Sequence, residues 1–132
     1  MIGQPDVINE IRFNGTGEAS LSMAGISAAI ASYEDKDFMN FSRTKIKEAK
    51  DIVENGLRAN GLNYLPSETN FILVDLGNMD ANKFRDEMLN QNILIRGKYG
   101  DFHNWSRVSM GKLSDLQRYV DALPLVISNL SA

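Results

Sequence analysis

The run of seven residues from Thr69 to Asp75 places the tightest constraint on how this chain can fold. It reads Thr-Asn-Phe-Ile-Leu-Val-Asp, and an extended backbone sends its apolar side chains to both sides. A strand that is apolar on both faces belongs in the interior of a layered structure. We therefore expect this run to be the central strand of a sheet that packs against helices.

Helical and strand-like patterns alternate around this run. Capping residues and apolar spacing predict five helices. The first three cover residues 5–12, residues 19–33, and the stretch from Asp35 or Asp37 to a stop at Asn60-Gly61. The fourth runs from Asp80 to Gln91, and the last begins at a capping box at Ser114 and should kink or restart at Pro124. The other expected strands cover residues 62–65, 93–96 and 105–110. The residues of 93–96 should run parallel to the central strand, because a helix joins the two. The predicted fold class is α/β (α+β): a small mixed sheet of three to four strands packed with helices, preceded by a two-helix N-terminal segment.

Composition excludes several classes of protein. The chain has 132 residues, a formal net charge of -3 and no cysteine, so a nucleic-acid partner, an anionic membrane surface and a thiolate metal site are not expected. No apolar run approaches the ~20 residues that span a bilayer. We expect a soluble, cytoplasmic protein. The nearly uncharged helix over 19–33 favours burial against other elements, or self-association.

Arg107 is the main functional clue. The strand around it alternates, so Val108 and Met110 share one face while Trp105, Arg107 and Ser109 share the other. A cation in such a strand needs an anionic partner, and its planar fork suits a carboxylate.

Arg96 ends the preceding strand, so a hairpin could bring both guanidinium groups to one place and bind a ligand with two anionic groups. The alternative is that each arginine pairs with a structural acid such as Asp75 or Asp101. Asn70 is a further candidate to touch a ligand, and the alternative is that its side chain hydrogen-bonds to adjacent backbone. We predict no catalytic residue and no metal ligand set, since the single histidine, His103, has no acidic cluster at ligand spacing.

Three segments together carry a family resemblance: Pro66-Ser67-Glu68-Thr69-Asn70-Phe71, Ile93-Leu94-Ile95-Arg96 and Ser106-Arg107-Val108-Ser109-Met110-Gly111. In this order they resemble the C-terminal small domain of the fold-type I pyridoxal phosphate-dependent aminotransferases, with the histidinol-phosphate aminotransferases closest. The resemblance implies that residues 35–132 are this small domain. Residues 1–34 would be an N-terminal segment with a helix from the junction to the large domain.

The resemblance also implies roles for the site residues. Arg107 would bind the α-carboxylate of the substrate, and Arg96 would help hold the anionic side of a phosphorylated substrate. The family's Schiff-base lysine and its contacts to the pyridine ring have no counterpart in this chain. It is therefore expected to be a piece of an aminotransferase, either an expressed domain or a shortened gene product, that binds no pyridoxal phosphate and is inactive alone.

The full-length parent would be a homo-oligomer, such as a dimer. It would transfer an amino group between an amino acid or amino phosphate and a 2-oxo acid. Two other functions remain open at this point. One is a regulatory module that binds an amino acid, and the other is a self-associating interaction domain.

Overall fold

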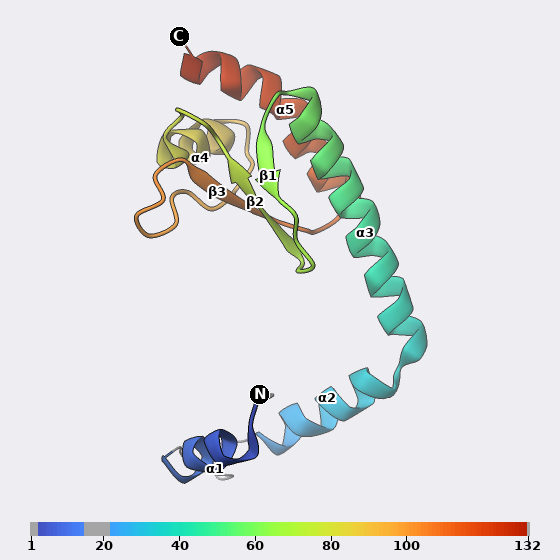
Figure 1. Ribbon diagram of the computed structural model, residues 1–132. Coiled ribbons are helices and arrows are strands. Elements are labelled where there is room, and N and C mark those ends of the chain that lie inside the picture. Colours follow the sequence, from blue (N-terminus) through green and yellow to red (C-terminus); the bar gives the residue numbers. More distant parts are fainter. Residues whose placement is uncertain (1–2, 15–21, 132) are drawn as a thin grey trace. The chain divides into compact units, whose positions relative to one another are not determined.

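The structure, a computed structural model, describes residues 3–14 and 22–131. The chain divides into two compact units, Met1–Phe41 and Ser42–Ala132, with the boundary inside helix α3. The predicted domain boundary after residue 34 stays a prediction. Along the chain, the elements labelled in Figure 1 are α1 (Pro5–Asn14), α2 (Met23–Glu34), α3 (Lys36–Ala59), β1 (Asn63–Leu65), β2 (Phe71–Asp75), α4 (Ala81–Asn90), β3 (Trp105–Ser109) and α5 (Leu113–Ser131).

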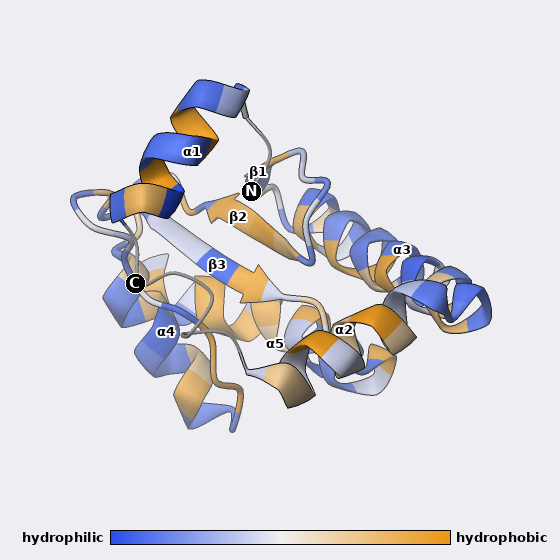
Figure 2. Cartoon of the chain, turned by 90° about the horizontal axis from the view of Figure 1, so that it is seen from below, coloured by the Kyte–Doolittle hydropathy of each residue, from blue (hydrophilic) through white to orange (hydrophobic). Residues whose placement is uncertain are grey.

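The first unit contains α1 and α2, and neither helix buries any of its residues among those described. Ser22 caps α2 by accepting the backbone N–H of Gly25 at 3.2 Å. The predicted helix start at Ala19 and most of the predicted loop over 13–17 lie outside the described residues. Figure 2 shows apolar residues along α2, and Met23 and Tyr33 are 73% and 70% exposed.

The second unit contains a three-stranded sheet in the order β1-β2-β3. Both pairings are antiparallel, with Tyr64 opposite Val74 and Leu73 opposite Arg107. The apolar run from Thr69 to Asp75 therefore supplies the central strand, as its sequence predicts. The strand starts at Phe71, two residues later than expected.

Residues 93–96 run parallel to the central strand, as predicted, but they form no regular strand and do not pair with it. This segment makes one isolated antiparallel bridge, in which the N–H of Arg96 donates to the carbonyl of Arg107 at 3.3 Å. Because β3 is antiparallel to both neighbours, residues 93–96 do run in the direction of β2. They lie on the far side of β3, however, so the two segments cannot pair, and every paired strand in the described residues is antiparallel.

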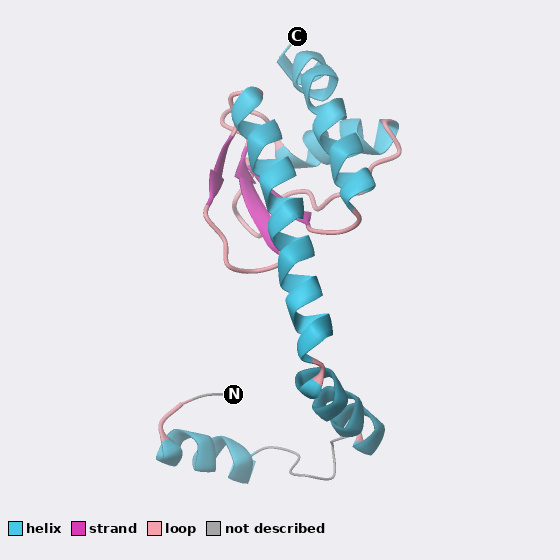
Figure 3. Cartoon of the chain, turned by 90° about the vertical axis from the view of Figure 1, so that its right-hand side faces the viewer, coloured by secondary structure: helices cyan, strands magenta, loops and turns pink. Residues whose placement is uncertain are grey.

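The two faces of the sheet differ in what covers them. Ile72, Val74 and Val108 point to one side, are at most 4% exposed, and join a single hydrophobic core with residues of α3, α4 and α5. Figure 3 shows these helices lying against the sheet. We call this side of the sheet the covered face. The opposite side, which carries Phe71, Leu73 and Arg107, is the open face.

One glycine sets the contact between two helices of the core. A Cβ atom at Gly56 in α3 would lie 2.5 Å from both methyl carbons of Val120 in α5. Such a separation is far inside van der Waals contact, so only glycine fits while the helices stay this close. The helix pair beside the sheet depends on this position.

Helix ends agree only partly with the sequence. Asp35 accepts the N–H of Phe38 at 2.8 Å, and Asp80 accepts the N–H groups of Asn82 and Lys83, so both predicted caps are confirmed. The predicted capping box at Ser114 is wrong. Helix α5 begins at Leu113, and the N–H groups of Asp115 and Leu116 donate to the carbonyl of Lys112.

Helix α5 also continues through Pro124, so the predicted restart is wrong. The proline is on the exposed side, while Leu123 and Val126 beside it are fully buried in the core and hold the helix in place. In the part of the chain that the structure describes, no helix combines the length and the apolar character needed to cross a membrane.

Candidate functional site: an arginine pair on the open face

Arg107 lies in the middle of β3 and on the open face of the sheet. Ser106 and Val108, its neighbours along the strand, are buried on the covered face, whereas Arg107 itself is half-buried. The predicted alternation of β3 is thus confirmed. The guanidinium group is directed away from the hydrophobic core.

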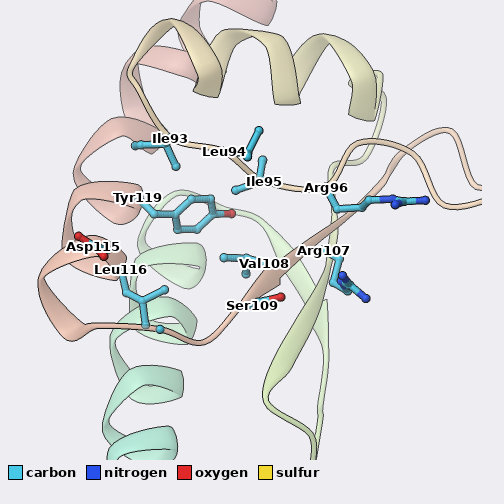
Figure 4. Close-up of a pocket in the computed structure, with 11 residues that line it drawn as sticks. Ile93, Leu94, Ile95, Arg96, Arg107, Val108, Ser109, Asp115, Leu116 and Tyr119 are labelled. Atoms are coloured by element: carbon cyan, nitrogen blue, oxygen red, sulfur yellow. The ribbon is translucent and has the colours of Figure 1, made fainter.

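Arg96 lies directly opposite Arg107 across the isolated bridge. Residues opposite one another in an antiparallel pair carry their side chains on the same face. Ser106 fixes the arrangement further, because its hydroxyl donates to the carbonyl of Arg96 at 2.6 Å. Figure 4 shows both arginine side chains extending in the same direction, away from Tyr119 and Leu116. The structure therefore brings the two predicted arginines together.

Neither arginine has an acidic partner among the described residues. Asp75, one suggested partner, instead accepts the Nδ2–H of Asn104 at 3.0 Å and the N–H of Gly77 at 2.9 Å. Asp101, the other, is exposed and makes no ion pair. The Nε of Arg107 is buried and has no hydrogen-bond partner. Two like charges opposite each other, with an unsatisfied buried donor, destabilise a sheet unless an anion joins them.

Aromatic rings take the place of acids around the two cations. The guanidinium carbon of Arg107 lies 5.2 Å from the centroid of the Phe71 ring and 5.8 Å from that of Tyr99. The guanidinium carbon of Arg96 lies 5.4 Å from the same Tyr99 ring. The negative face of an aromatic ring attracts a cation without neutralising it. The arginines are thus supported and still carry charge for a ligand.

A pocket of about 550 Å³ opens where residues 93–95 separate from β3. Its lining is mainly apolar, with the two arginines at one end and Tyr119 of α5 at the other: Ile93, Leu94, Ile95, Arg96, Arg107, Val108, Ser109, Gly111, Asp115, Leu116 and Tyr119 (Figure 4). Burial raises the pKa of Tyr119 well above its usual value, so the phenol stays protonated at neutral pH. The two guanidinium groups extend away from the Tyr119 end of this apolar pocket (Figure 4).

Asn70 is absent from the lining of this pocket. It lies just before β2, and its backbone carbonyl accepts the N–H of Met110 at 2.8 Å. Its side chain is exposed and makes no hydrogen bond among the described residues. A role of the Asn70 side chain in binding a ligand stays a prediction.

The site does not fit covalent attachment of pyridoxal phosphate, the cofactor that the family resemblance implies. Attachment needs a lysine amine for the Schiff base, and no lysine lines the pocket. Three lysines of α3 are engaged elsewhere: Lys45 with Glu48, Lys47 with Asp51, and Lys50 with the carbonyl of Ser67. Among the described residues, no cluster of three histidines, aspartates or glutamates could hold a metal ion.

Sequence reasoning missed the aromatic residues of the site. Tyr99 lies between Gly97 and Gly100, and these glycines indicate a turn but give no information about a ring contact. Phe71 faces Arg107 only through the register of β2 and β3, which pairs Phe71 with Ser109. Tyr119 is the third missed residue, and it lines the pocket from α5.

Comparisons with known proteins agree with the resemblance. The model of the family named aminotransferase class I and II matches residues 2–123. Histidinol-phosphate aminotransferase 2 of Pseudomonas fluorescens Pf-5 is 33% identical over 127 residues, which cover 93% of this chain and 32% of that protein. Histidinol-phosphate aminotransferase 1 of Psychrobacter arcticus is 30% identical over 132 residues, which cover 94% of this chain and 33% of that protein.

A solved structure shows the same likeness in three dimensions. Histidinol-phosphate aminotransferase from Sinorhizobium meliloti, in complex with pyridoxal-5'-phosphate, superposes with a TM-score of 0.76 at 28% identity, over 92% of this chain and 34% of that one. The chain thus spans about a third of the length of the relatives it matches. With a family match over most of its residues and a shared fold, the chain belongs to the class I and II aminotransferases.

Proposed function

We propose that this chain is the substrate-carboxylate-binding portion of a histidinol-phosphate aminotransferase-like enzyme. Arg107 would hold the carboxylate of an amino acid or 2-oxo acid through its planar fork, and Arg96 would add a second positive charge beside it. The observation that carries the proposal is the buried, unpartnered Nε of Arg107 in a pair of arginines with no acid. A carboxylate at the guanidinium groups would offset the repulsion between the two cations.

The proposal extends to the parent enzyme. It would transfer an amino group between an amino acid or amino phosphate and a 2-oxo acid, with pyridoxal phosphate as the electron sink, as an oligomer in the cytoplasm. The names of the relatives support the reaction class, and the Sinorhizobium meliloti complex supports the cofactor. This chain alone would be inactive, because no lysine lines its pocket.

A chimaera tests this function. The chain would replace the stretch that it matches in the Pseudomonas fluorescens enzyme, and transamination would be measured with pyridoxal phosphate added. The chimaera should be active and the chain alone should not. Arg107→Ala should lower kcat/KM of the chimaera roughly 100-fold, about 3 kcal/mol, because a charge-assisted, two-pronged contact is lost.

Arg118→Ala is the matched control for this experiment. Arg118 is an exposed arginine of α5 that is absent from the pocket lining, so its loss should leave kcat/KM unchanged. Equal kcat/KM values for the Arg107→Ala and unchanged chimaeras would remove the carboxylate assignment. Activity of the chain alone would contradict the proposed inactivity.

Exposed apolar residues on α2 favour a second candidate function, self-association. Met23, Ile30 and Tyr33 are each more than half exposed, and the helix has no charge before Glu34. Sedimentation of the unchanged chain and of Ile30→Glu would test it. A dimer that Ile30→Glu dissociates would support self-association, and a monomer at high concentration would exclude it.

A further inference from the structure

The unpaired arginines raise the question of what holds their side chains in one place. A guanidinium group on a flexible side chain loses rotamer freedom when it grips a ligand, so prior ordering strengthens binding. Acidic partners would order the two groups but would also occupy their donors. Among the described residues no acid plays this part, and the neighbouring groups are the rings of Phe71 and Tyr99.

Tyr99 is placed to act on both arginines at once. Its ring centroid is 5.4 Å from the guanidinium carbon of Arg96 and 5.8 Å from that of Arg107. Phe71, by contrast, reaches only Arg107. Contacts within about 6 Å of an aromatic ring are attractive for a cation. The single Tyr99 ring therefore draws two mutually repelling guanidinium groups to one location.

The loop that carries Tyr99 is fastened at its beginning. A Cβ atom at Gly97 would lie 2.5 Å from the Oδ1 of Asn82, so the backbone passes tightly against the start of α4. The same Oδ1 accepts the N–H of Lys98 at 3.2 Å. Tyr99 and Phe102 then form a tight turn, in which the N–H of Phe102 donates to the carbonyl of Tyr99 at 2.9 Å and Gly100 has a φ of 54°.

The loop is fastened again at its end. The N–H of Ala81 donates to the carbonyl of His103 at 2.7 Å. The side chain of Asn104 donates to Asp75 at 3.0 Å. With both ends bound to the start of α4 and the end of β2, the backbone at Tyr99 has little freedom. An aromatic ring on such a loop can order neighbouring side chains, because its own position is set.

We propose that Tyr99 is a positioning residue that holds Arg96 and Arg107 together for an anionic ligand. The inference rests on the proposed function, in which these arginines bind a carboxylate. Tyr99 acts through the arginines and through its ring, so its hydroxyl is dispensable. Tyr99→Phe should therefore behave like the unchanged chain, and Tyr99→Leu should not.

The test uses the ¹⁵N-labelled 132-residue chain and the NMR signals of the arginine Nε–H groups. In the unchanged chain the Tyr99 ring should shift the Nε–H resonances of Arg96 and Arg107 away from the chemical shifts of exposed arginines such as Arg118. Tyr99→Leu should move both signals toward the exposed position, while Tyr99→Phe retains them. Phe102→Leu is the matched control, because it changes an exposed ring of the same turn that makes no contact with either arginine.

Titration with pyruvate, a small 2-oxo acid, supplies the functional readout. Tyr99→Leu should weaken the response of the Arg107 signal roughly twofold to fivefold, which is the range expected for an exposed cation–ring contact. Tyr99→Phe should bind pyruvate with the affinity of the unchanged chain. Arginine signals that stay in place in Tyr99→Leu would overturn the role of Tyr99. No response of the unchanged chain to pyruvate would instead count against the carboxylate site itself, so the two failures are distinguishable.

Discussion

On the covered face of the sheet, Ile72 and Val74 are fully buried against three helices, and Val108 is 4% exposed. On the open face, Phe71, Leu73 and Arg107 alternate with them along the same strands and are only half-buried. The apolar side chains of the covered face are buried within this unit. The open face carries two like charges and a buried donor without a partner. The hydrophobic core and the arginine pair thus lie on opposite sides of one small sheet.

The contrast separates two kinds of residue that look alike in the sequence. Neighbours one position apart in β2 and β3 should respond differently to substitution, since those on the covered face are buried in the core and those on the open face are half-buried. A side chain that binds a ligand can lower the stability of the free protein, because its partner is present only in the complex.

The largest expected effect is on the covered face. Ile72→Ala should lower the free energy of unfolding by about 2–5 kcal/mol, because it removes a fully buried side chain and leaves a cavity. Leu73→Ala, one residue further along β2 and on the open face, should have a clearly smaller effect. Urea unfolding of both variants measures the difference. Equal losses would show that the two faces are not packed differently.

A smaller effect is expected where α3 meets α5. Gly56→Ala should lower the free energy of unfolding by about 1–3 kcal/mol, because the added methyl group overlaps both methyl groups of Val120. The double variant with Val120→Ala should recover part of the loss, since the space is restored. Thermal unfolding of the single and double variants checks this coupling. An unchanged Tm for Gly56→Ala would contradict the close helix contact.

Arg107→Ala should change the free energy of unfolding by no more than about 1 kcal/mol. Its contacts with the two rings are stabilising, while the repulsion from Arg96 and the unpaired Nε oppose them. Urea unfolding without ligand tests this balance, with Arg118→Ala as the exposed control. A loss of several kcal/mol would indicate that Arg107 holds the fold together, and the contrast between the faces would fail.

The smallest effect concerns the cap of α4, a helix on the covered face. Hydrogen bonds from the backbone N–H groups of Lys83 and Asn82 hold the pKa of Asp80 below its usual value. A carboxyl group whose pKa is lower in the folded state stabilises the fold above its unfolded pKa. This contribution disappears as the pH falls through the folded pKa.

Asp80→Asn keeps a capping oxygen but does not titrate. Its unfolding midpoint in urea should therefore fall less steeply between about pH 5 and pH 2 than that of the unchanged chain. Asp101→Asn, on an exposed aspartate with no ion pair, should keep the original pH dependence. Parallel curves for Asp80→Asn and the unchanged chain would exclude a role of this cap in acid stability.

Much of the covered face could be predicted because local rules decide it. The apolar run around Ile72 identifies the central strand, and Asp35 and Asp80 identify two helix starts through their side-chain oxygens. Predictions failed where a longer-range contact decides. Residues 93–96 meet β3 at one bridge only, and burial of Leu123 and Val126 carries α5 past Pro124. Strand order is a global property that neighbouring residues do not specify.

The two charged residues of the site could be predicted from the sequence, but the residues that surround them could not. Alternation alone places Arg107 on the open face, and one hairpin brings Arg96 beside it. The contribution of Tyr99 depends on how Gly97 passes Asn82, and this packing contact has no signature in the sequence. Absence of an acidic partner likewise follows only from where Asp75 makes its hydrogen bonds.

The most direct test of the central claim is the kcat/KM of the chimaera carrying Arg107→Lys. Lysine keeps the positive charge but loses the planar fork that binds both oxygens of a carboxylate. If Arg107 grips the substrate in this way, kcat/KM should fall at least about tenfold, equivalent to the loss of one charge-assisted hydrogen bond, while Arg118→Lys leaves it unchanged. Equal kcat/KM values for Arg107→Lys and the unchanged chimaera would contradict the account.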